Sequence, residues 1–252
     1  MAVTEQDPGT AVGSPRRRFT PGGVLQAVGI TVGLLAMVGG FALLAVMYRP
    51  YSVPTDSMQP TIRPGDVVLA HPVKAGDIGR GDIVVFNDPQ WEGSDLVKRV
   101  VAVGGDTVAC CDTRGRITVD GHPVTEPYLQ PGAGGSAGSG TFDVTVPPGR
   151  LFLLGDNRPV SQDSRVHLAI DGGTVAADQV VGRVDGVVWP LGDTRALTRT
   201  SAFDALPGRD ASTPGPLSLL TWTTLGGGAL VLLTAALGTF GGLVRRLRSR
   251  RT

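Results

Sequence analysis

The longest uninterrupted apolar run in this chain covers residues 24–47, which are almost all apolar or small and carry no charge. About 20 such residues in a helix span the roughly 30 Å of hydrocarbon in a bilayer. The run is longer than the apolar core of a secretory signal peptide, which has about 7–15 residues, and Tyr48-Arg49-Pro50-Tyr51 after it is a poor cleavage site. The segment therefore predicts an uncleaved transmembrane helix.

A second span is predicted over residues 217–244, where threonines and glycines dilute the apolar character without excluding a membrane helix. Basic residues flank both spans on their outer sides: Arg16, Arg17 and Arg18 before the first, and Arg245, Arg246, Arg248, Arg250 and Arg251 after the second. The positive-inside rule then predicts a multi-pass cell-membrane protein with cytoplasmic tails, 1–23 and 245–252, and an extracytoplasmic domain, 48–216. Because the arginines lie directly beside apolar spans, nucleic acid is not predicted as a partner.

The sequence between the spans indicates a mainly β domain. Between residues 49 and 216 it carries 15 basic and 20 acidic residues, and short β-branched stretches recur, each bounded by Gly, Pro or Asp. Strands are expected at 66–70, 82–86, 96–103, 107–109, 116–119, 142–146, 150–154 and 180–188. Asp120-Gly121 predicts a hairpin turn, residues 130–140 a flexible loop, and residues 202–216 a linker. The expected fold class is a β-barrel or sandwich domain flanked by two transmembrane helices.

Two adjacent cysteines, Cys110 and Cys111, are the only ones in the chain. A disulfide between neighbours closes a strained ring, and a free or intermolecular thiol is the alternative, so both states stay open. The Cys and His spacings typical of zinc sites are missing from the sequence, and neither a metal nor a cofactor is predicted.

Ser57 is a candidate nucleophile, and its position ten residues beyond the first apolar run predicts that it lies at the bilayer surface. A serine hydroxyl needs an adjacent base, and Lys98, among valines, can serve if burial lowers its pKa from about 10.4 toward about 7–8. Taken alone, a turn serine and an exposed strand lysine are the simpler interpretations. A Ser-His-Asp triad is disfavoured, because the sequence has no Gly-x-Ser-x-Gly and no motif supports the three histidines, which are His71, His122 and His167.

Four segments, in this order, resemble the bacterial type I signal peptidases. They are Pro54-Thr55-Asp56-Ser57-Met58-Gln59-Pro60-Thr61, Gly81-Asp82-Ile83-Val84-Val85-Phe86, Val97-Lys98-Arg99 with Gly105-Asp106, and Gly155-Asp156-Asn157-Arg158-Pro159-Val160-Ser161-Gln162-Asp163-Ser164-Arg165. The resemblance covers the core from about Tyr51 to Arg165. Asp56 stands where the family often has Gly or Glu, and Val103-Gly104 replaces the usual Leu-Pro, but neither departure removes a reacting group.

The resemblance implies a Ser/Lys dyad that removes signal peptides from exported preproteins. Ser57 would attack, Lys98 would be the base, Thr55 and the Ser57 N–H would form the oxyanion hole, and Ser161 would orient Lys98. The implied supporting residues are Asp156, Asn157, Asp163 and Arg165, and the implied linings of shallow substrate pockets are Val53, Ile62 and Val97. Signal peptides, bound as extended strands, and membrane lipid are the expected partners, with possible proximity to the secretion translocon.

Two other functions are compatible with parts of this pattern. A specialised processing protease of the same family, acting on a pilus or conjugation component, would carry the same dyad. A non-catalytic, membrane-tethered β binding module would keep the fold but would not need Ser57 and Lys98. The likeness to self-cleaving repressors with Ser and Lys does not extend to function, because the spans are present and a DNA-binding domain is missing from the sequence.

Overall fold

The structure is a computed structural model that describes residues 21–130, 140–197, 200–208 and 215–249. The arginines of the N-terminal tail, Arg250, Arg251, most of the predicted loop (131–139) and part of the predicted linker (209–214) lie outside the described residues. The chain forms two compact units, one made of residues 1–39 with 223–252 and the other of residues 40–222. Each unit is described by itself.

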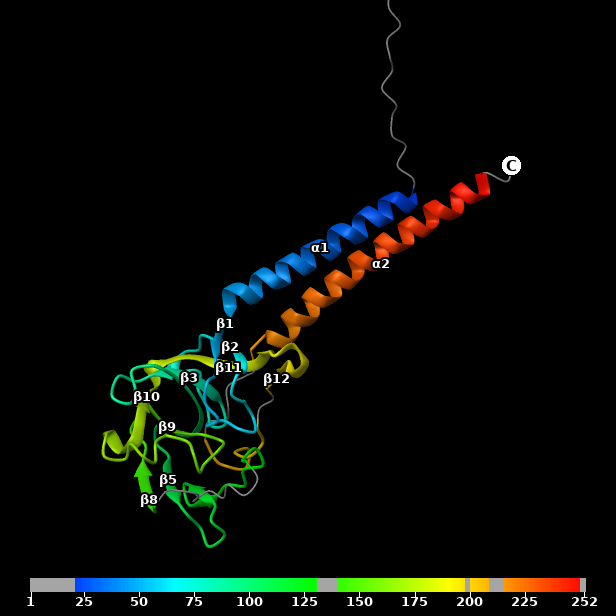
Figure 1. Ribbon diagram of the computed structural model, residues 1–252. Coiled ribbons are helices and arrows are strands. Elements are labelled where there is room, and N and C mark those ends of the chain that lie inside the picture. The colour runs from blue at the N-terminus through cyan, green and yellow to red at the C-terminus, as the bar shows by residue number, and fades with distance from the viewer. Residues whose placement is uncertain (1–20, 131–139, 198–199, 209–214, 250–252) are drawn as a thin grey trace, which may run out of the picture. The chain divides into compact units, whose positions relative to one another are not determined.

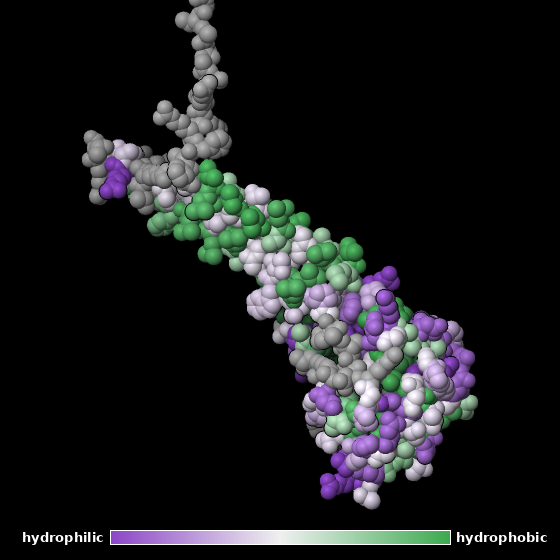
Figure 2. Space-filling model, turned by 180° about the vertical axis from the view of Figure 1, so that it is seen from behind, coloured by the Kyte–Doolittle hydropathy of each residue, from purple (hydrophilic) through white to green (hydrophobic). Residues whose placement is uncertain are grey.

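The first unit consists of most of two long helices, α1 (Pro21–Met47) and α2 (Leu217–Ser249). Both are long and apolar enough to cross a membrane by length and composition. Apolar side chains cover much of their surface, as the green atoms in Figure 2 show. The predicted spans fall inside these helices, and their insertion in a bilayer stays a prediction.

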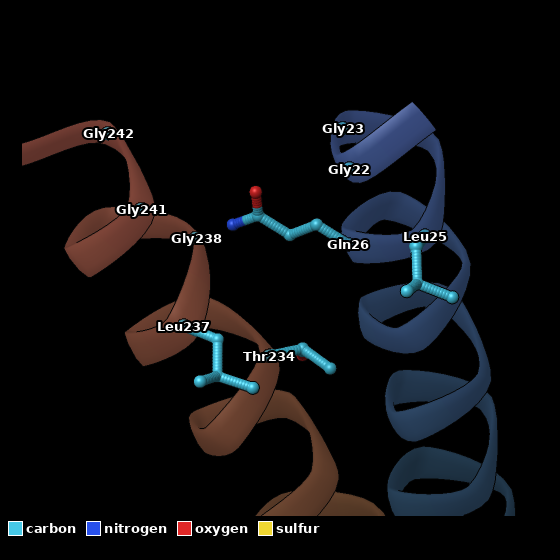
Figure 3. Close-up of a pocket in the computed structure, with 9 residues that line it drawn as sticks. All are labelled: Gly22, Gly23, Leu25, Gln26, Thr234, Leu237, Gly238, Gly241 and Gly242. Carbon is cyan, nitrogen blue, oxygen red and sulfur yellow. The ribbon is translucent and has the colours of Figure 1, made fainter. Parts of the chain in front are cut away.

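Glycines bring the two helices into close contact. A Cβ added at Gly33 would lie 2.8 Å from the carbonyl oxygen of Gly227, and one added at Gly227 would lie 2.5 Å from the backbone nitrogen of Met37. Further along, the side chain of Gln26 points toward Gly238 across a crevice between the helices (Figure 3). Small residues at such contacts allow helix backbones to approach, which is how membrane helices commonly associate.

The second unit is mainly β, as predicted, and contains two antiparallel sheets (Figure 1). The larger sheet has the order β1-β2-β11-β3-β4-β9-β10, with β12 paired to β11. Its strands are β1 (Arg49–Ser52), β2 (Val67–His71), β3 (Ile83–Asn87), β4 (Asp95–Val103), β9 (Arg150–Leu154), β10 (Thr174–Ala176), β11 (Val180–Trp189) and β12 (Arg195–Ala196). Single 3-10 turns lie at Ala75–Asp77, Asp171–Gly173, Ala177–Gln179 and Leu191–Asp193.

The smaller sheet has the order β7-β6-β5-β8. Its strands are β5 (Thr107–Cys110), β6 (Ile117–Val119), β7 (His122–Pro123) and β8 (Phe142–Thr145). The expected hairpin turn joins β6 to β7, and both of its residues have positive φ, 51° at Asp120 and 76° at Gly121. Cys110 and Cys111 form a disulfide, one of the two states that the sequence left open.

Among the described residues of the β unit, buried apolar side chains form three large clusters, one of which joins the two sheets. Phe203 and Leu206 belong to the cluster that joins the sheets and are only 2% and 8% exposed. This differs from the expected linker over 202–216, because the first residues of that segment are packed in the core. A separate small cluster joins Tyr48 at the end of α1 to Leu217 and Leu220 at the start of α2.

The helix contact leads to a cross-linking prediction. A Cβ at Gly29 would lie 3.4 Å from the Cβ of Thr234, close to the separation of about 3.8 Å in disulfides. The double variant Gly29→Cys/Thr234→Cys should therefore cross-link on mild oxidation. Adding Gly33→Leu should lower the cross-linked fraction roughly fivefold or more, because the new side chain would overlap the backbone of α2.

The matched control is Gly39→Leu, since a Cβ at Gly39 would meet no atom within 4 Å. This change should leave the cross-linked fraction unchanged. Mass spectrometry of the linked peptides measures both fractions. Equal cross-linking in the two leucine variants would show that the glycine contact does not hold the helices together.

Candidate active site

Ser57 lies in the connection between β1 and β2, which is closed at its base by backbone hydrogen bonds. The Val53 N–H donates to the Asp66 carbonyl at 2.9 Å, and the Gly65 N–H donates back to the Val53 carbonyl at 2.8 Å. Directly after Ser57 the chain makes a tight turn anchored by Met58, whose side chain is fully buried. The serine is thus held at the start of a fixed turn, and its residue surface is only 7% exposed.

Lys98 lies in the middle of β4, paired with Val84 of β3, and its side chain reaches the serine. The Lys98 Nζ is 2.9 Å from the Ser57 Oγ and 3.2 Å from the Val97 carbonyl oxygen. Burial lowers the pKa of Lys98 below its usual value, and the carboxylates of Asp163, Glu92 and Asp156 oppose that shift. A neutral amine within hydrogen-bond distance of a buried hydroxyl is the arrangement that a lysine general base requires.

The pairing of β4 with β9 brings the third polar segment to the dyad. Arg99 is opposite Leu154, so the chain leaves β9 at Gly155, beside Lys98. There the Asn157 N–H donates to the Ser57 carbonyl oxygen at 2.9 Å, and the Asn157 side-chain amide donates to the Asp56 carbonyl at 3.1 Å. Asn157 therefore holds the peptide groups on both sides of the Ser57 Cα.

Gly155 permits a close approach that no other residue would allow. A Cβ at this position would lie 2.5 Å from the Ser57 carbonyl oxygen and 2.2 Å from the Ser161 Oγ. This role of Gly155 was not predicted, although a glycine that opens a polar segment directly after a strand is a signal for such contact.

Three of the implied supporting residues, Asp156, Asp163 and Arg165, take part in two buried ion pairs. Arg99 donates to both carboxylate oxygens of Asp156, at 2.8 and 2.6 Å, and the Thr61 hydroxyl donates to the same carboxylate. Arg165 likewise donates to both oxygens of Asp163, at 2.8 Å each, while Asp163 accepts the Gly155 N–H at 3.0 Å. The first pair fixes the Gly155–Arg165 segment to β4 and the second fixes the fold of the segment itself, since two-point contacts between Arg and carboxylate are strong and directional.

Thr55 and Ser161 lie next to the dyad in different ways. The Thr55 Oγ1 is 3.3 Å from the Ser57 Oγ. Ser161 is only 4% exposed, and within the described part of the chain its Oγ has no hydrogen-bond partner. The hydrogen bond from Lys98 to Ser161 that the expected orienting role requires is not formed in this structure, where Lys98 contacts Ser57 and Val97.

The three residues expected to line substrate pockets belong to a single apolar cluster below the Ser57 turn. Val53 and Ile62 are buried, at 4% and 0% exposure, and Val97 is half-buried. In this structure Val97 is therefore the accessible member of the three, and the lining role of Val53 and Ile62 stays a prediction.

The histidines lie elsewhere. His71 is 2.8 Å from Asp185, His122 contacts the Asp120 carbonyl, and His167 stacks on Trp91 with ring centroids 4.0 Å apart. The side-chain partners of the Ser57 hydroxyl are Lys98 and Thr55. Among the residues that the structure describes, no group of three or more His, Cys, Asp or Glu side chains could hold a metal ion.

The sequence predicted no role for three further residues of this region, Glu126, Tyr128 and Arg158. Arg158 has a fully buried guanidinium paired with Glu126, and Tyr128 lies under the Arg99 guanidinium at 4.0 Å. Arg158 stands inside one of the motifs but had no predicted role. Glu126 and Tyr128 lie in a turn segment with no local pattern that indicates burial.

Comparison with known proteins gives a consistent result. Residues 24–189 match the family described as signal peptidase, peptidase S26. Signal peptidase I of Mycobacterium tuberculosis (strain CDC 1551 / Oshkosh) is 34% identical over 209 residues, covering 63% of this chain and 71% of that protein. Signal peptidase IB of Staphylococcus aureus (strain COL) is 33% identical over 183 residues, covering 66% and 88%. The crystal structure of a signal peptidase I from Enterococcus faecalis V583 aligns with a TM-score of 0.33 and 29% identity, covering 41% of this chain and 93% of that one.

The burial of Lys98 predicts a pH-dependent gain in stability when its amine is removed. Because the pKa of Lys98 is lowered in the folded chain, the unfolded chain binds more protons between that pKa and the ordinary value of about 10.4. The lowered pKa reduces the free energy of unfolding by its full amount below that pKa, and the reduction disappears above about pH 10.4. Each tenfold difference in proton affinity between the two states corresponds to about 1.4 kcal/mol. Lys98→Met should therefore melt above wild type at pH 6, and the difference should shrink as the pH rises.

The control is Lys74→Met, which removes the only other lysine of the chain, an exposed one. Its melting temperature should follow that of wild type at every pH. Thermal unfolding followed by circular dichroism between pH 6 and pH 10 measures both. A difference for Lys98→Met that is independent of pH would mean that Lys98 is not desolvated in the folded protein.

Proposed function

Because the chain belongs to the signal peptidase family of peptidase S26, we propose that it is a membrane-bound serine endopeptidase with Ser57 as nucleophile and Lys98 as general base. Its substrates are exported preproteins, from which it removes the N-terminal signal peptide. The observation that carries the dyad is the 2.9 Å distance between the Lys98 Nζ and the Ser57 Oγ in a buried setting. The lowered pKa of Lys98 supports its role as the base.

In the first half of the reaction the Ser57 Oγ attacks the scissile carbonyl carbon while its proton passes to the neutral Lys98 Nζ. The carbonyl oxygen becomes an oxyanion. Lys98 then gives the proton to the leaving amine, the C–N bond breaks, and an acyl-enzyme ester on Ser57 remains. In the second half Lys98 takes a proton from water, the hydroxide oxygen attacks the ester, and the proton returns to the Ser57 Oγ as the signal peptide is released.

The oxyanion is stabilised by the Ser57 N–H and the Thr55 hydroxyl. Among the described residues no acceptor receives a hydrogen bond from the Ser57 N–H, which leaves that donor available, and the Thr55 Oγ1 lies 3.3 Å from the attacking oxygen. Donors of this kind contribute roughly 3–4 kcal/mol each in related acyl-transfer sites. Asn157 holds both peptide groups next to Ser57, so the N–H direction is fixed before substrate binds.

Ser161 is proposed to orient Lys98 during the reaction. Its buried Oγ lacks a partner among the described residues, and a buried hydroxyl without a partner is costly. Once the Ser57 Oγ is bonded to substrate carbon, the Lys98 ammonium loses its serine partner, and the Ser161 Oγ is a suitable acceptor.

Anchoring by α1 and α2 has a physical purpose in this function. Signal peptides carry an apolar core that partitions into the bilayer, so an enzyme tethered to the same surface meets them at a raised effective concentration. Substrate would pair as an extended strand, with small side chains in pockets formed by Val53, Ile62 and Val97. Membrane lipid surrounds the helices, and the secretion translocon lies nearby.

Incubation of the detergent-solubilised chain with a secreted preprotein, followed by mass spectrometry of the new N-terminus, tests the function. Wild type should cut after a small residue at the end of the signal peptide. Ser57→Ala and Lys98→Ala should each lower the rate by about 10⁴-fold or more, because each removes a reacting group. Lys74→Ala is the control and should cleave as wild type does. Cleavage by Lys98→Ala at more than about 1% of the wild-type rate would disprove the dyad.

The proposed topology is tested by reporter fusions. Reporters placed before Val24 and after Thr252 should report the cytoplasm, because both ends are rich in arginine. A reporter at Gly135, which lies outside the described residues, should report the opposite side of the membrane. A C-terminal reporter on that opposite side would mean that α2 does not cross the bilayer.

A further inference from the structure

A carboxylate that belongs to no recognised motif lies buried behind the dyad. The Glu126 side chain is 3% exposed, in the segment that follows β7. It accepts hydrogen bonds from the Arg158 Nη1 at 3.1 Å, from the Arg158 Nη2, and from the Tyr128 hydroxyl at 2.6 Å. Burying a carboxylate and a guanidinium is expensive even when they are paired, so core packing alone does not explain why the chain keeps this pair.

Arg158 connects Glu126 to the nucleophile. Its side chain is fully buried, and while two of its nitrogens bind Glu126, the third, Nε, donates to the Gly155 carbonyl oxygen at 2.9 Å. Gly155 packs directly against the Ser57 carbonyl, and Asn157, between Gly155 and Arg158 in the chain, donates to that carbonyl at 2.9 Å. One guanidinium thus fixes the turn that holds Ser57.

Tyr128 connects the same carboxylate to the lysine. Its hydroxyl donates to Glu126, and its ring lies under the Arg99 guanidinium at 4.0 Å. Arg99 directly follows Lys98 in β4 and binds Asp156 through both carboxylate oxygens. Burial and the Glu126 carboxylate both raise the pKa of Tyr128 well above its usual range, so the phenol stays protonated and keeps donating.

We propose that Glu126 is a positioning residue for the dyad: through Arg158 it fixes the turn that holds Ser57, and through Tyr128 it fixes the strand that carries Lys98. This inference rests on the proposed function for its kinetic part. Glu126 acts at a distance, since its side-chain partners are Arg158 and Tyr128 and neither dyad residue is among them.

The expected kinetic effect follows from this indirect placement. Without the charge of Glu126, the buried Arg158 guanidinium has no carboxylate partner and turns toward other acceptors, so the Gly155 carbonyl loses its fixed donor. A small displacement of reacting groups lowers the rate of the chemical step by large factors. Substrate binding by strand pairing and pockets involves other parts of the domain. The loss should therefore appear in kcat and leave KM nearly unchanged.

Three variants separate positioning from simple stability. Glu126→Gln keeps the shape and removes the charge. The double variant Glu126→Met/Arg158→Met removes the ion pair and leaves apolar side chains, an exchange that is often neutral for stability. Asp106→Asn is the matched control, because it breaks another buried ion pair, in which Arg80 donates to both carboxylate oxygens and Asp106 also accepts the Val103 N–H at the end of β4.

Steady-state cleavage of a preprotein and thermal unfolding are measured for each variant. We expect kcat to fall about 10- to 100-fold in Glu126→Gln with KM within about twofold of wild type. The double variant should regain most of the melting temperature but not kcat, since the Gly155 carbonyl still lacks its donor. Asp106→Asn should lose stability while keeping kcat. If kcat follows the melting temperature across all variants, Glu126 is only a stabilising residue and the proposal is overturned.

Hydrogen exchange gives a readout that does not depend on activity. In Glu126→Gln the amides of the segment from Gly155 to Ser161 should exchange about tenfold faster than in wild type, whereas in Asp106→Asn they should not. Unchanged exchange in Glu126→Gln would refute the link to the nucleophile turn. A wild-type chain that cleaves no preprotein, with exchange altered as expected, would disprove the proposed function and leave the structural link established.

Discussion

The amine of Lys98 is buried beside the Ser57 hydroxyl, and no carboxylate of the described residues forms an ion pair with it. The contacts of the surrounding β unit hold the amine in this buried position. An ammonium ion in this position would lack water, so burial favours the neutral amine and lowers its pKa. The same burial costs folding energy, which the fold must offset elsewhere. The site therefore combines a group that destabilises the folded state with a framework of unusually strong local contacts.

That framework consists of three buried ion pairs in which each arginine contacts both oxygens of a carboxylate: Arg99 with Asp156, Arg158 with Glu126, and Arg165 with Asp163. The charges balance, so the region around Lys98 carries no excess of either sign from these pairs. Such pairs add little net stability over apolar packing, but their two-point geometry fixes direction. Two catalytic groups that must stay within hydrogen-bond distance depend more on surroundings of fixed orientation than on added folding stability.

Local patterns in the sequence predicted part of this arrangement, and packing between distant segments decided the rest. The strand predicted at 82–86 lies within a residue of β3, because β-branched runs beside Gly-Asp turns are local signals. Ser57 and Lys98 likewise lie in contiguous motifs. Glu126 and Arg158, by contrast, are 32 positions apart, and neither segment shows that its charge is buried. Local composition also does not show which apolar side chains are packed in the core. Phe203 and Leu206, at the start of the expected linker, are buried there.

The proposed membrane-bound enzyme needs its helices only as anchors, which explains why the two parts of the chain are built on different physical principles. In the helical unit, glycines such as Gly33 and Gly227 allow backbone contact, because water-driven burial of apolar side chains is not available inside a bilayer. In the β unit, apolar side chains fill three buried clusters, and the charges of the site are compensated in pairs. The contact of Tyr48 with Leu217 and Leu220 lies inside the β unit, so the ends of both helices are held by the domain that carries the proposed dyad. A change in the glycine contact should therefore alter anchoring without altering the distance between Lys98 and Ser57.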